Sequence, residues 1–470
     1  MGSLFSALNS ASSALTAFER AVDVTQENVA NANTPGYAAQ DPTIEALQFG
    51  PDGLSGGVVE QTQDSRNPQA DAAVQQQLSL VGQFQQLQTS LQPLETVFDV
   101  SSSSPIPSAL TQLFQSFSQW SSQPSSADYQ TAVIDAAQQT ASAFQQAAAQ
   151  LASIQNSNAQ DIQSAVAQIN QDATEVQAYN VAMMHTGAPD AGLSAKLESS
   201  LENLSNYANV QLLPGVGGTV TVLLGGQTPL VIGDQVDALS IEPAAAAESG
   251  APNIAILDSN GNDVTSQVTS GSLSALLNVQ NTVLPSLAGG GQQAGALNTL
   301  AQSVADTVNN LLEQGSTTST QPYQAGTPLF TYTANQATGV AASLAVNPAI
   351  TPSQLAAVQT GPPLVSNGVA LQLAALDNAP QGALNGQSFT QYFATLVSQV
   401  GNAAGNAATS ATAQQQVLTQ AQTLQQQLSG VSLDDEAVQL VQLQSAYQAA
   451  SKVVTIVDQM TQDLMNMVPA

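Results

Sequence analysis

The chain has 470 residues, of which 43% are hydrophobic and only 8% are charged, and its formal net charge is −29. The charge is negative because basic residues are scarce, with four Lys and Arg against 33 Asp and Glu. So few basic residues exclude a nucleic-acid footprint and argue against docking on an anionic membrane, and the absence of cysteine excludes disulfides, thiol catalysis and cysteine-ligated metals.

The first 30 residues carry the heptad pattern of a coiled-coil helix. The spacing alternates between four and three, and it places a narrow apolar seam on one face of a helix. The helix is expected to end near residues 31–33, because Thr34 precedes Pro35 and is disfavoured in the α region. Pro35 and Gly36 suit the central positions of a type II turn. The positions of the pattern are Leu4, Leu8, Ala11, Leu15, Phe18, Val22, Thr25 and Val29, of which only Thr25 is polar.

The middle of the chain changes character twice. Residues 71–205 are rich in Ala and Gln with apolar stripes, which predicts helices. Residues 210–270 instead contain short β-branched runs, and Gly225-Gly226 and Asn260-Gly261 are hairpin and turn signals. Helix is predicted again over 272–314 and from 388 to the end.

The C-terminal helix mirrors the first one. Ser432 and Asp435 have the spacing of a capping box, and Asp434, Asp435 and Glu436 suit the positive end of a helix dipole. Gly430 separates this helix from an upstream one that carries its own stripe. The C-terminal seam consists of Leu440, Leu443, Tyr447, Ala450, Val454, Val457, Thr461, Leu464 and Val468, and the upstream stripe of Val417, Ala421, Leu424 and Leu428.

Each terminal seam is too narrow to bury its helix on all sides, so each needs a partner. The other terminus is the first partner to expect; the alternative is two ordinary helices packed on a globular core. The residues expected to form the assembly seam are Leu4, Leu8, Leu15, Phe18, Val22 and Val29 at one end and Leu440, Leu443, Tyr447, Val454, Val457 and Leu464 at the other.

We therefore expect a mainly α fold with a β insertion, whose terminal helices form a coiled-coil-like pair. A chain that leaves a helical body, forms a β domain and returns places both ends at the same pole. The expected parts are a terminal assembly domain, a central mainly helical domain and a small β-rich outer domain, made respectively of residues 1–50 with 425–470, 51–205 with 271–424 (loop and short strands over 315–386), and 206–270.

No residue pattern predicts catalysis, a cofactor or a metal. His185 is the single histidine, whereas a zinc site needs three or four ligands. The run Asp258–Asp263 lacks the Gly and Glu of a calcium loop and predicts a polar turn. The acids Asp434–Glu436 are explained by a helix start. There is no run of about 18 apolar residues to span a membrane, and residues 1–14 lack the features of a cleaved secretory signal.

Several segments, chiefly at the two ends of the chain, resemble a known family. Asn28-Val-Ala-Asn-Ala-Asn-Thr-Pro-Gly-Tyr37 resembles the signature that closes the N-terminal helix of flagellar rod, hook and hook-associated proteins. Residues 429–438 and 444–453 look like the end of the FlgK family of hook-associated proteins, and residues 217–230 and 341–350 are similar to segments of the same family. The signature positions are Asn31, Asn33, Thr34, Pro35, Gly36 and Tyr37.

The resemblance implies a structural, non-enzymatic subunit of the flagellum at the junction between hook and filament. It would be secreted by the flagellar type III apparatus and would lie in the extracellular flagellum. Its implied partners are copies of itself, the hook protein, the second junction protein (hook-associated protein 3) and an export chaperone on the C-terminal helix. A hook or distal rod protein of the same axial family, and a secreted adhesin or effector, are the alternatives. Arg and Lys expected on the end helices are mostly Gln and Ala here, which puts salt bridges between subunits in doubt.

Overall fold

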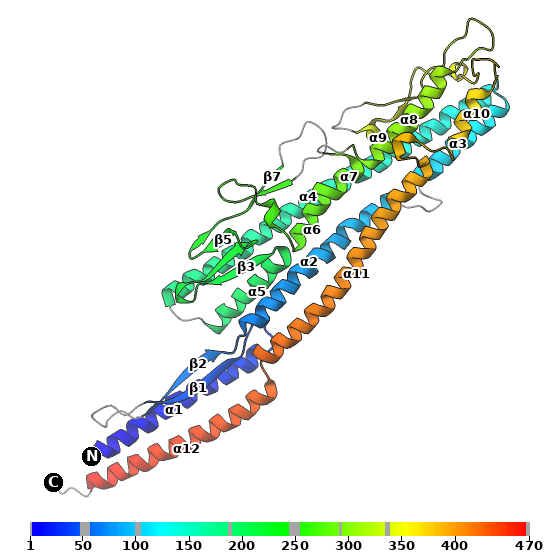
Figure 1. The fold of residues 1–470 in the computed structure, drawn as a ribbon. Coiled ribbons are helices and arrows are strands. Elements are labelled where there is room, and N and C mark those ends of the chain that lie inside the picture. Colours follow the sequence, from blue (N-terminus) through cyan, green and yellow to red (C-terminus); the bar gives the residue numbers. More distant parts are fainter. Residues whose placement is uncertain are drawn as a thin grey trace.

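The computed structural model describes residues 2–47, 57–98, 105–186, 190–243, 254–290, 294–333 and 339–466. The molecule is elongated, and its first and last helices lie together at one end (Figure 1). Long helices run from this terminal part into a helical body, and the larger β-sheet lies against the side of that body. The expectation of a mainly α fold with a β insertion is confirmed.

The terminal part pairs α1 (Gly2–Asn31) with α12 (Leu433–Asn466), which lie side by side and run in opposite directions (Figure 1). An antiparallel hairpin, β1 (Gln40–Leu47) and β2 (Gly57–Asp64), packs against α1. This hairpin does not show in the sequence, because Pro42, Asp41 and Glu45 interrupt the strand pattern of β1. The boundary predicted at residue 50 lies between its two strands.

The body is built on α2 (Pro68–Val97) and α11 (Phe389–Ser429), which pack along one another. Both helices begin at defined caps. The Asn67 side chain accepts hydrogen bonds from the backbone N–H groups of residues 69 and 70, and Ser388 forms a capping box with Gln391. Further helices complete the body: α3 (Pro105–Ser122), α4 (Ala127–Thr186), α5 (Ala191–Tyr207), α6 (Ser272–Asn278), α7 (Leu284–Ala288) and α8 (Ala296–Gln314).

Aromatic side chains fill the core of the body where these helices meet. Phe114 and Phe389 stack with ring centroids 5.9 Å apart, and Phe98 lies 6.1 Å from Phe393. The Trp120 indole is fully buried and donates to the Pro124 carbonyl at 3.1 Å, so its polar atom is satisfied inside the core. This packing holds the far end of the molecule together.

The β-rich region consists of two antiparallel sheets packed on the C-terminal half of α4 and on α5 and α6. The Gly225-Gly226 turn joins its second and third strands, as the sequence predicts. Asn170 and Asn180 of α4 hold the sheets by hydrogen bonds to strand and turn backbone. The strands are β3 (Val210–Pro214), β4 (Val220–Leu224), β5 (Thr228–Ile232) and β6 (Gln235–Val236) in one sheet, and β7 (Ser240–Pro243) and β8 (Ile254–Leu257) in the other.

Residues 315–386 depart from the expected loop with short strands. They do contain a two-stranded sheet of β9 (Phe330–Thr331) and β10 (Ala345–Val346), but also the helices α9 (Val340–Ser343) and α10 (Gly368–Ala375). The interpretation of residues 368–375 as loop is therefore wrong. Helix α10 is two turns long and packs on α3, and such a short helix has too few residues to show a periodic pattern.

Candidate assembly site at the paired chain ends

Helix α1 buries small residues rather than the large ones of the predicted seam. Ala11, Ala17, Ala21, Thr25 and Asn28 are buried, and of these Ala11 and Thr25 belong to the predicted pattern. Their shortness lets α1 approach its neighbours closely. Leu8, Leu15, Phe18 and Val22 are half-buried and Val29 is exposed, while the side chain of Leu4 lies outside the described residues.

On α12 the predicted seam faces inward in part. Leu443 and Val457 are buried, Leu440 and Val454 are half-buried, and Tyr447 is 40% exposed. The side chain of Leu464 and all of Val468 lie outside the described residues. The structure thus brings the two seam helices together in one chain, and it leaves several large apolar side chains of α12, and Val29 of α1, open to solvent. That these residues carry assembly stays a proposal.

Asn28 is the polar centre of the terminal part. Its Nδ2 donates to the Gln40 carbonyl and to Glu436 Oε1, both at 2.8 Å. Its Oδ1 accepts from the Tyr37 hydroxyl and from the Gln40 N–H, both at 2.9 Å. One fully buried amide therefore uses all four of its hydrogen bonds to tie together α1, the turn after it, β1 and α12.

Burial raises the pKa values of two titratable groups that hydrogen-bond to Asn28, Tyr37 and Glu436. Burial raises the pKa of Tyr37 to about 12, and the neighbouring acids Glu27, Glu436 and Asp64 add to the rise. Burial also raises the pKa of Glu436, while the hydrogen bond from Asn28 opposes that rise. From the sequence, Glu436 was predicted only to stabilise the start of α12 by interacting with the helix dipole. Its position at the centre of the site depends on α1 and α12 meeting, which the composition of α12 does not reveal.

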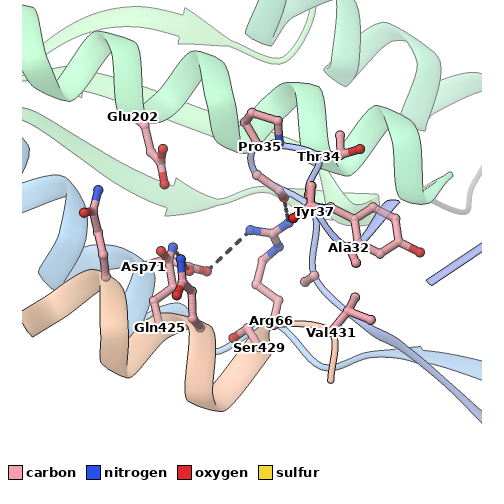
Figure 2. Close-up of a pocket in the computed structure, with 16 residues that line it drawn as sticks. Ala32, Thr34, Pro35, Tyr37, Arg66, Asp71, Glu202, Gln425, Ser429 and Val431 are labelled. Carbon is pink, nitrogen blue, oxygen red and sulfur yellow. Dashed lines mark hydrogen bonds and ion pairs between the residues drawn. The ribbon is translucent and has the colours of Figure 1, made fainter. Parts of the chain in front are cut away.

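The signature turn has the predicted form. The Thr34 N–H donates to the Asn31 carbonyl at 2.8 Å, the Tyr37 N–H donates to the Thr34 carbonyl at 3.2 Å, and Gly36 has a φ of 73°. Asn33, Thr34 and Pro35 are exposed. The turn borders a cavity of about 530 Å³, which the end of α11 and the side chain of Arg66 also line (Figure 2).

Gly36 presses the turn against helix α5. A Cβ atom at this position would collide with the Ala195 carbonyl oxygen, and φ is positive, so we expect Gly36→Ala to destabilise the fold by roughly 2–4 kcal/mol. Thermal unfolding of the purified chain measures this. Gly405→Ala is the matched control: it lies inside α11 with open space around it, and it should stabilise by about 0.5–1 kcal/mol. Equal stability of the two variants would contradict this role of Gly36.

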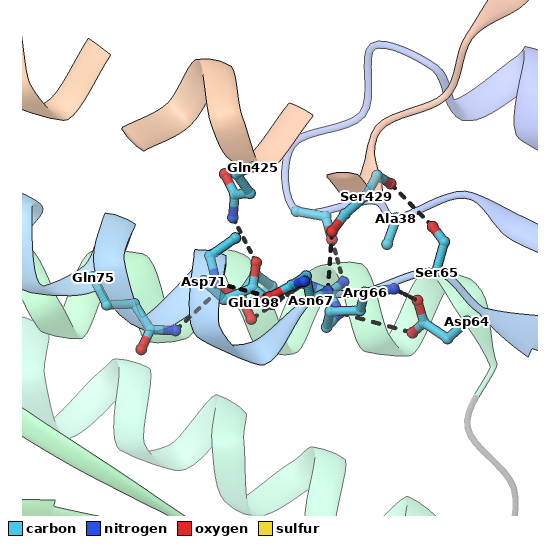
Figure 3. Close-up of polar contacts among 12 residues, drawn as sticks. Ala38, Asp64, Ser65, Arg66, Asn67, Asp71, Gln75, Glu198, Gln425 and Ser429 are labelled. Carbon is cyan, nitrogen blue, oxygen red and sulfur yellow. Dashed lines mark hydrogen bonds and ion pairs between the residues drawn. The ribbon is translucent and has the colours of Figure 1, made fainter. Parts of the chain in front are cut away.

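Arg66 joins the terminal part to the body (Figure 3). Its Nη2 donates to the Gly36 carbonyl at 2.7 Å, and its Nε lies 3.7 Å from Asp64 Oδ2 at the end of β2. On the body side, Nη1 lies 3.3 Å from Glu198 Oε2 of α5 and 3.7 Å from Asp71 Oδ2 of α2. One of only four basic residues thus bridges both parts of the molecule. The sequence shows no pattern that singles it out.

The other residues weighed for chemistry lie apart from this site. His185 is exposed near the end of α4. Asp258 accepts from the backbone N–H groups of Asn260 and Asn262, both at 2.8 Å, so its carboxylate shapes its own turn. Within the described ranges, no group of three or more His, Cys, Asp or Glu is placed to hold a metal ion. Nor does any helix in those ranges have the length and apolar character to cross a membrane.

Three family descriptions match successive parts of the chain. Residues 8–37 match the flagella basal body rod protein family, and residues 425–467 match the C-terminal family of flagellar basal body rod FlgEFG proteins. These two matches coincide with the paired ends, α1 with its turn and α12, and they define a structural protein of the bacterial flagellum. Residues 91–330 match the helical domain of flagellar hook-associated protein FlgK. Because that match covers more than half of the chain, the protein belongs to the flagellar hook-associated protein FlgK family.

Whole-chain likenesses agree with this membership. Flagellar hook-associated protein 1 of Bacillus subtilis strain 168 is 24% identical over 511 aligned residues, which cover 99% of each chain. The structure of the flagellar hook junction protein FlgK from Burkholderia pseudomallei matches with a TM-score of 0.65 and 16% identity, over 77% of this chain and 100% of that one. At such identities the two likenesses show a common fold.

Proposed function

We propose that this flagellar subunit joins the hook to the filament by packing its paired terminal helices against those of neighbouring subunits. The observation that carries the proposal is the outer face of α12. It exposes five large apolar residues to solvent, two within the first three turns of the helix and three after residue 452, each between 47% and 61% exposed. These residues, which we call the outer stripe, are Val438, Val441, Val453, Ile456 and Met460.

The outer stripe lies beside the face of α12 that carries Leu443 and Val457, about a third of a turn around the helix. A helix with apolar residues on two faces packs on two sides, and among the described residues α12 finds a partner on only one of them. Copies related by a head-to-tail contact that does not close on itself build a helical tube. Each subunit of such an assembly can therefore contact its neighbour through the same exposed face of α12.

The partners that fit this role are copies of the chain, the hook protein on one side and the second junction protein on the other. We place the assembled subunit in the extracellular flagellum. The names of the relatives, a hook-associated protein and a hook junction protein, support this placement. We assign the chain a structural role and no catalytic, cofactor-binding or metal-binding residue.

Removing the gene tests the proposal. We expect cells of the deletion strain to carry hooks without filaments, to shed filament protein into the medium, and to regain swimming with the intact gene. Electron microscopy of the flagella and analysis of the medium measure this. Cells that still swim would point to an adhesin or effector instead. Labelling of isolated hook–basal bodies separates a junction protein from a hook or distal rod protein.

Before export, the outer stripe exposes apolar surface that a dedicated chaperone would cover. We expect a chain truncated after Gly430, which lacks all of α12, to lose the flagellar export chaperone in a pull-down from the source bacterium. The full chain carrying Gln444→Asp on the flank of the stripe is the control and should retain it. A truncated chain that binds the chaperone as well as the full chain does would refute this partner.

A further inference from the structure

The terminal part is connected to the body by two short crossings that lie next to each other. One crossing, residues 65–67, links β2 to α2, and the other, residues 430–432, links α11 to α12. Hydrogen bonds hold the crossings together: Ser429 accepts through its carbonyl from the Ala39 N–H at 2.9 Å and through its Oγ from the Asn67 N–H at 3.0 Å. Such a pair of linkers is a hinge unless side chains fix its angle.

Side chains from both parts meet at this hinge around Arg66. The guanidinium contacts the Gly36 carbonyl and Asp64 on the terminal side, and Asp71 and Glu198 on the body side. The carboxylates of Asp71 and Glu198 are almost fully buried, with 7% and 6% of their side chains exposed. Opening the hinge would separate the Arg66 guanidinium from its partners on one side of the joint, and it would expose the carboxylates of Asp71 and Glu198 to water.

We propose that Arg66, Asp71 and Glu198 form a proton-responsive lock that fixes the angle between the terminal helix pair and the body. Negative charge outnumbers positive charge at this joint, so a proton on the shared carboxylates stabilises the closed form. The lock acts within the isolated subunit, so it stands independently of how the subunit assembles.

The partners of Glu198 explain why it is the responsive group. Its Oε1 accepts from Gln75 Nε2 at 3.0 Å, and its Oε2 faces Arg66. Burial raises the pKa of Glu198 to about 7, the charge of Asp71 adds to the rise, and Arg66 and the hydrogen bond from Gln75 oppose it.

The neighbouring elements supply further charged and titratable groups. Glu202 of α5 and Asp71 of α2 both have a raised pKa, chiefly because of burial. Tyr179 of α4 also has a raised pKa from burial, while Arg66 opposes that rise. Helix α11 contributes the neutral Gln425, which donates to Asp71 Oδ1 at 2.8 Å. The remaining groups that face the joint are Asp64 of β2, Tyr37 of the turn, and Glu175 of α4, which accepts from Ser200 of α5.

The sign of the pH effect follows from the raised pKa. A carboxyl that is protonated in the closed joint and ionised in water releases a proton on opening, so acid favours the closed joint. Between pH 4.5, the ordinary value, and about pH 7, the value in the closed joint, a rising pH favours opening by up to about tenfold per unit. Above that range Glu198 is ionised in both forms and contributes no further change to the ratio of open to closed molecules.

The absence of cysteine allows two spin labels to be placed without other changes. Exposed positions on the two parts are Ser12 of α1 and Gln163 of α4. Spin labels are attached to the full chain carrying Ser12→Cys and Gln163→Cys, and pulsed electron–electron double resonance measures the distance between them. We expect one narrow distance distribution at about pH 5 and a broader or second distribution at about pH 8. An identical distribution at both pH values would overturn the lock.

Three variants test which residue causes the pH dependence of the distance between the labels. Glu198→Gln keeps the shape but cannot titrate, and it should show the narrow distance at both pH values. Asp172→Asn is the matched control: burial raises the pKa of Asp172 to about 6, but its carboxylate accepts from Gln168 of its own helix and is not a partner of Arg66, so this variant should keep the pH response. Arg66→Lys loses the fork that reaches both parts and should give the broad distribution at every pH. A pH response that survives in Glu198→Gln, or that vanishes in Asp172→Asn, would assign the change to other groups. Circular dichroism checks that each variant is folded.

Discussion

Replacing Asn28 with leucine is expected to open the terminal part while the body stays folded. The substitution removes four hydrogen bonds and leaves Glu436, the Tyr37 hydroxyl and the Gln40 backbone without their buried partner. Each orphaned buried group costs about 1–3 kcal/mol, so we expect a loss of roughly 3 kcal/mol or more. The loss falls on α1 and α12, because all four hydrogen bonds of the Asn28 side chain stay within the terminal part.

Hydrogen exchange followed by mass spectrometry measures the effect region by region. Protection over residues 20–31 and 436–447 should fall by about 100-fold, and protection in the aromatic core of the body should stay unchanged. Asn31→Ala is the control, since Asn31 lies at the end of the same helix with solvent-exposed hydrogen bonds and should cost less than about 1 kcal/mol. Equal loss of protection in both variants would show that Asn28 has no special role.

The local pattern of the sequence was enough to predict the end of α1, the turn at Pro35-Gly36, the start of α12 and the switch to strands. Each of these depends on a few neighbouring residues whose conformational preferences are strong, such as a proline, a glycine with positive φ or a capping serine. Membership of the family also followed from short stretches at the two ends, and the family matches confirm it.

The joint could not be predicted in the same way. Arg66 meets Asp71 and Glu198 because α2 packs beside α5, and nothing near Arg66 in the sequence records that packing. The face that α1 buries was predicted only in part, at Ala11 and Thr25. The heptad pattern drew attention to Leu15 and Phe18, whereas the structure buries the small residues beside them. A pattern of apolar residues shows which faces avoid water, but it does not show which partner covers each face.

The partner of the outer stripe is the remaining question, and two substitutions address it. We expect the double variant Val441→Asp and Ile456→Asp to be exported but to be missing from isolated hooks. Both side chains are exposed in the single chain, at 61% and 55%, so their loss changes the stability of the subunit by less than about 1 kcal/mol. In the assembly each position would lose roughly 2 kcal/mol of apolar burial and would bury a charge, which lowers incorporation on the order of 10²–10³-fold.

The control is the double variant Gln444→Asp and Thr455→Asp. It adds the same charges to the same helix at exposed positions on the flank of the stripe, so it should complement a deletion strain normally. Western blots of the medium and of purified hook–basal bodies separate export from incorporation. If the outer-stripe variant enters hooks as well as the control does, α12 contacts its neighbours through another face. If only the stripe variant stays in the medium, the face that the single chain leaves uncovered is the face that the flagellum covers, because the two variants differ in position and not in charge.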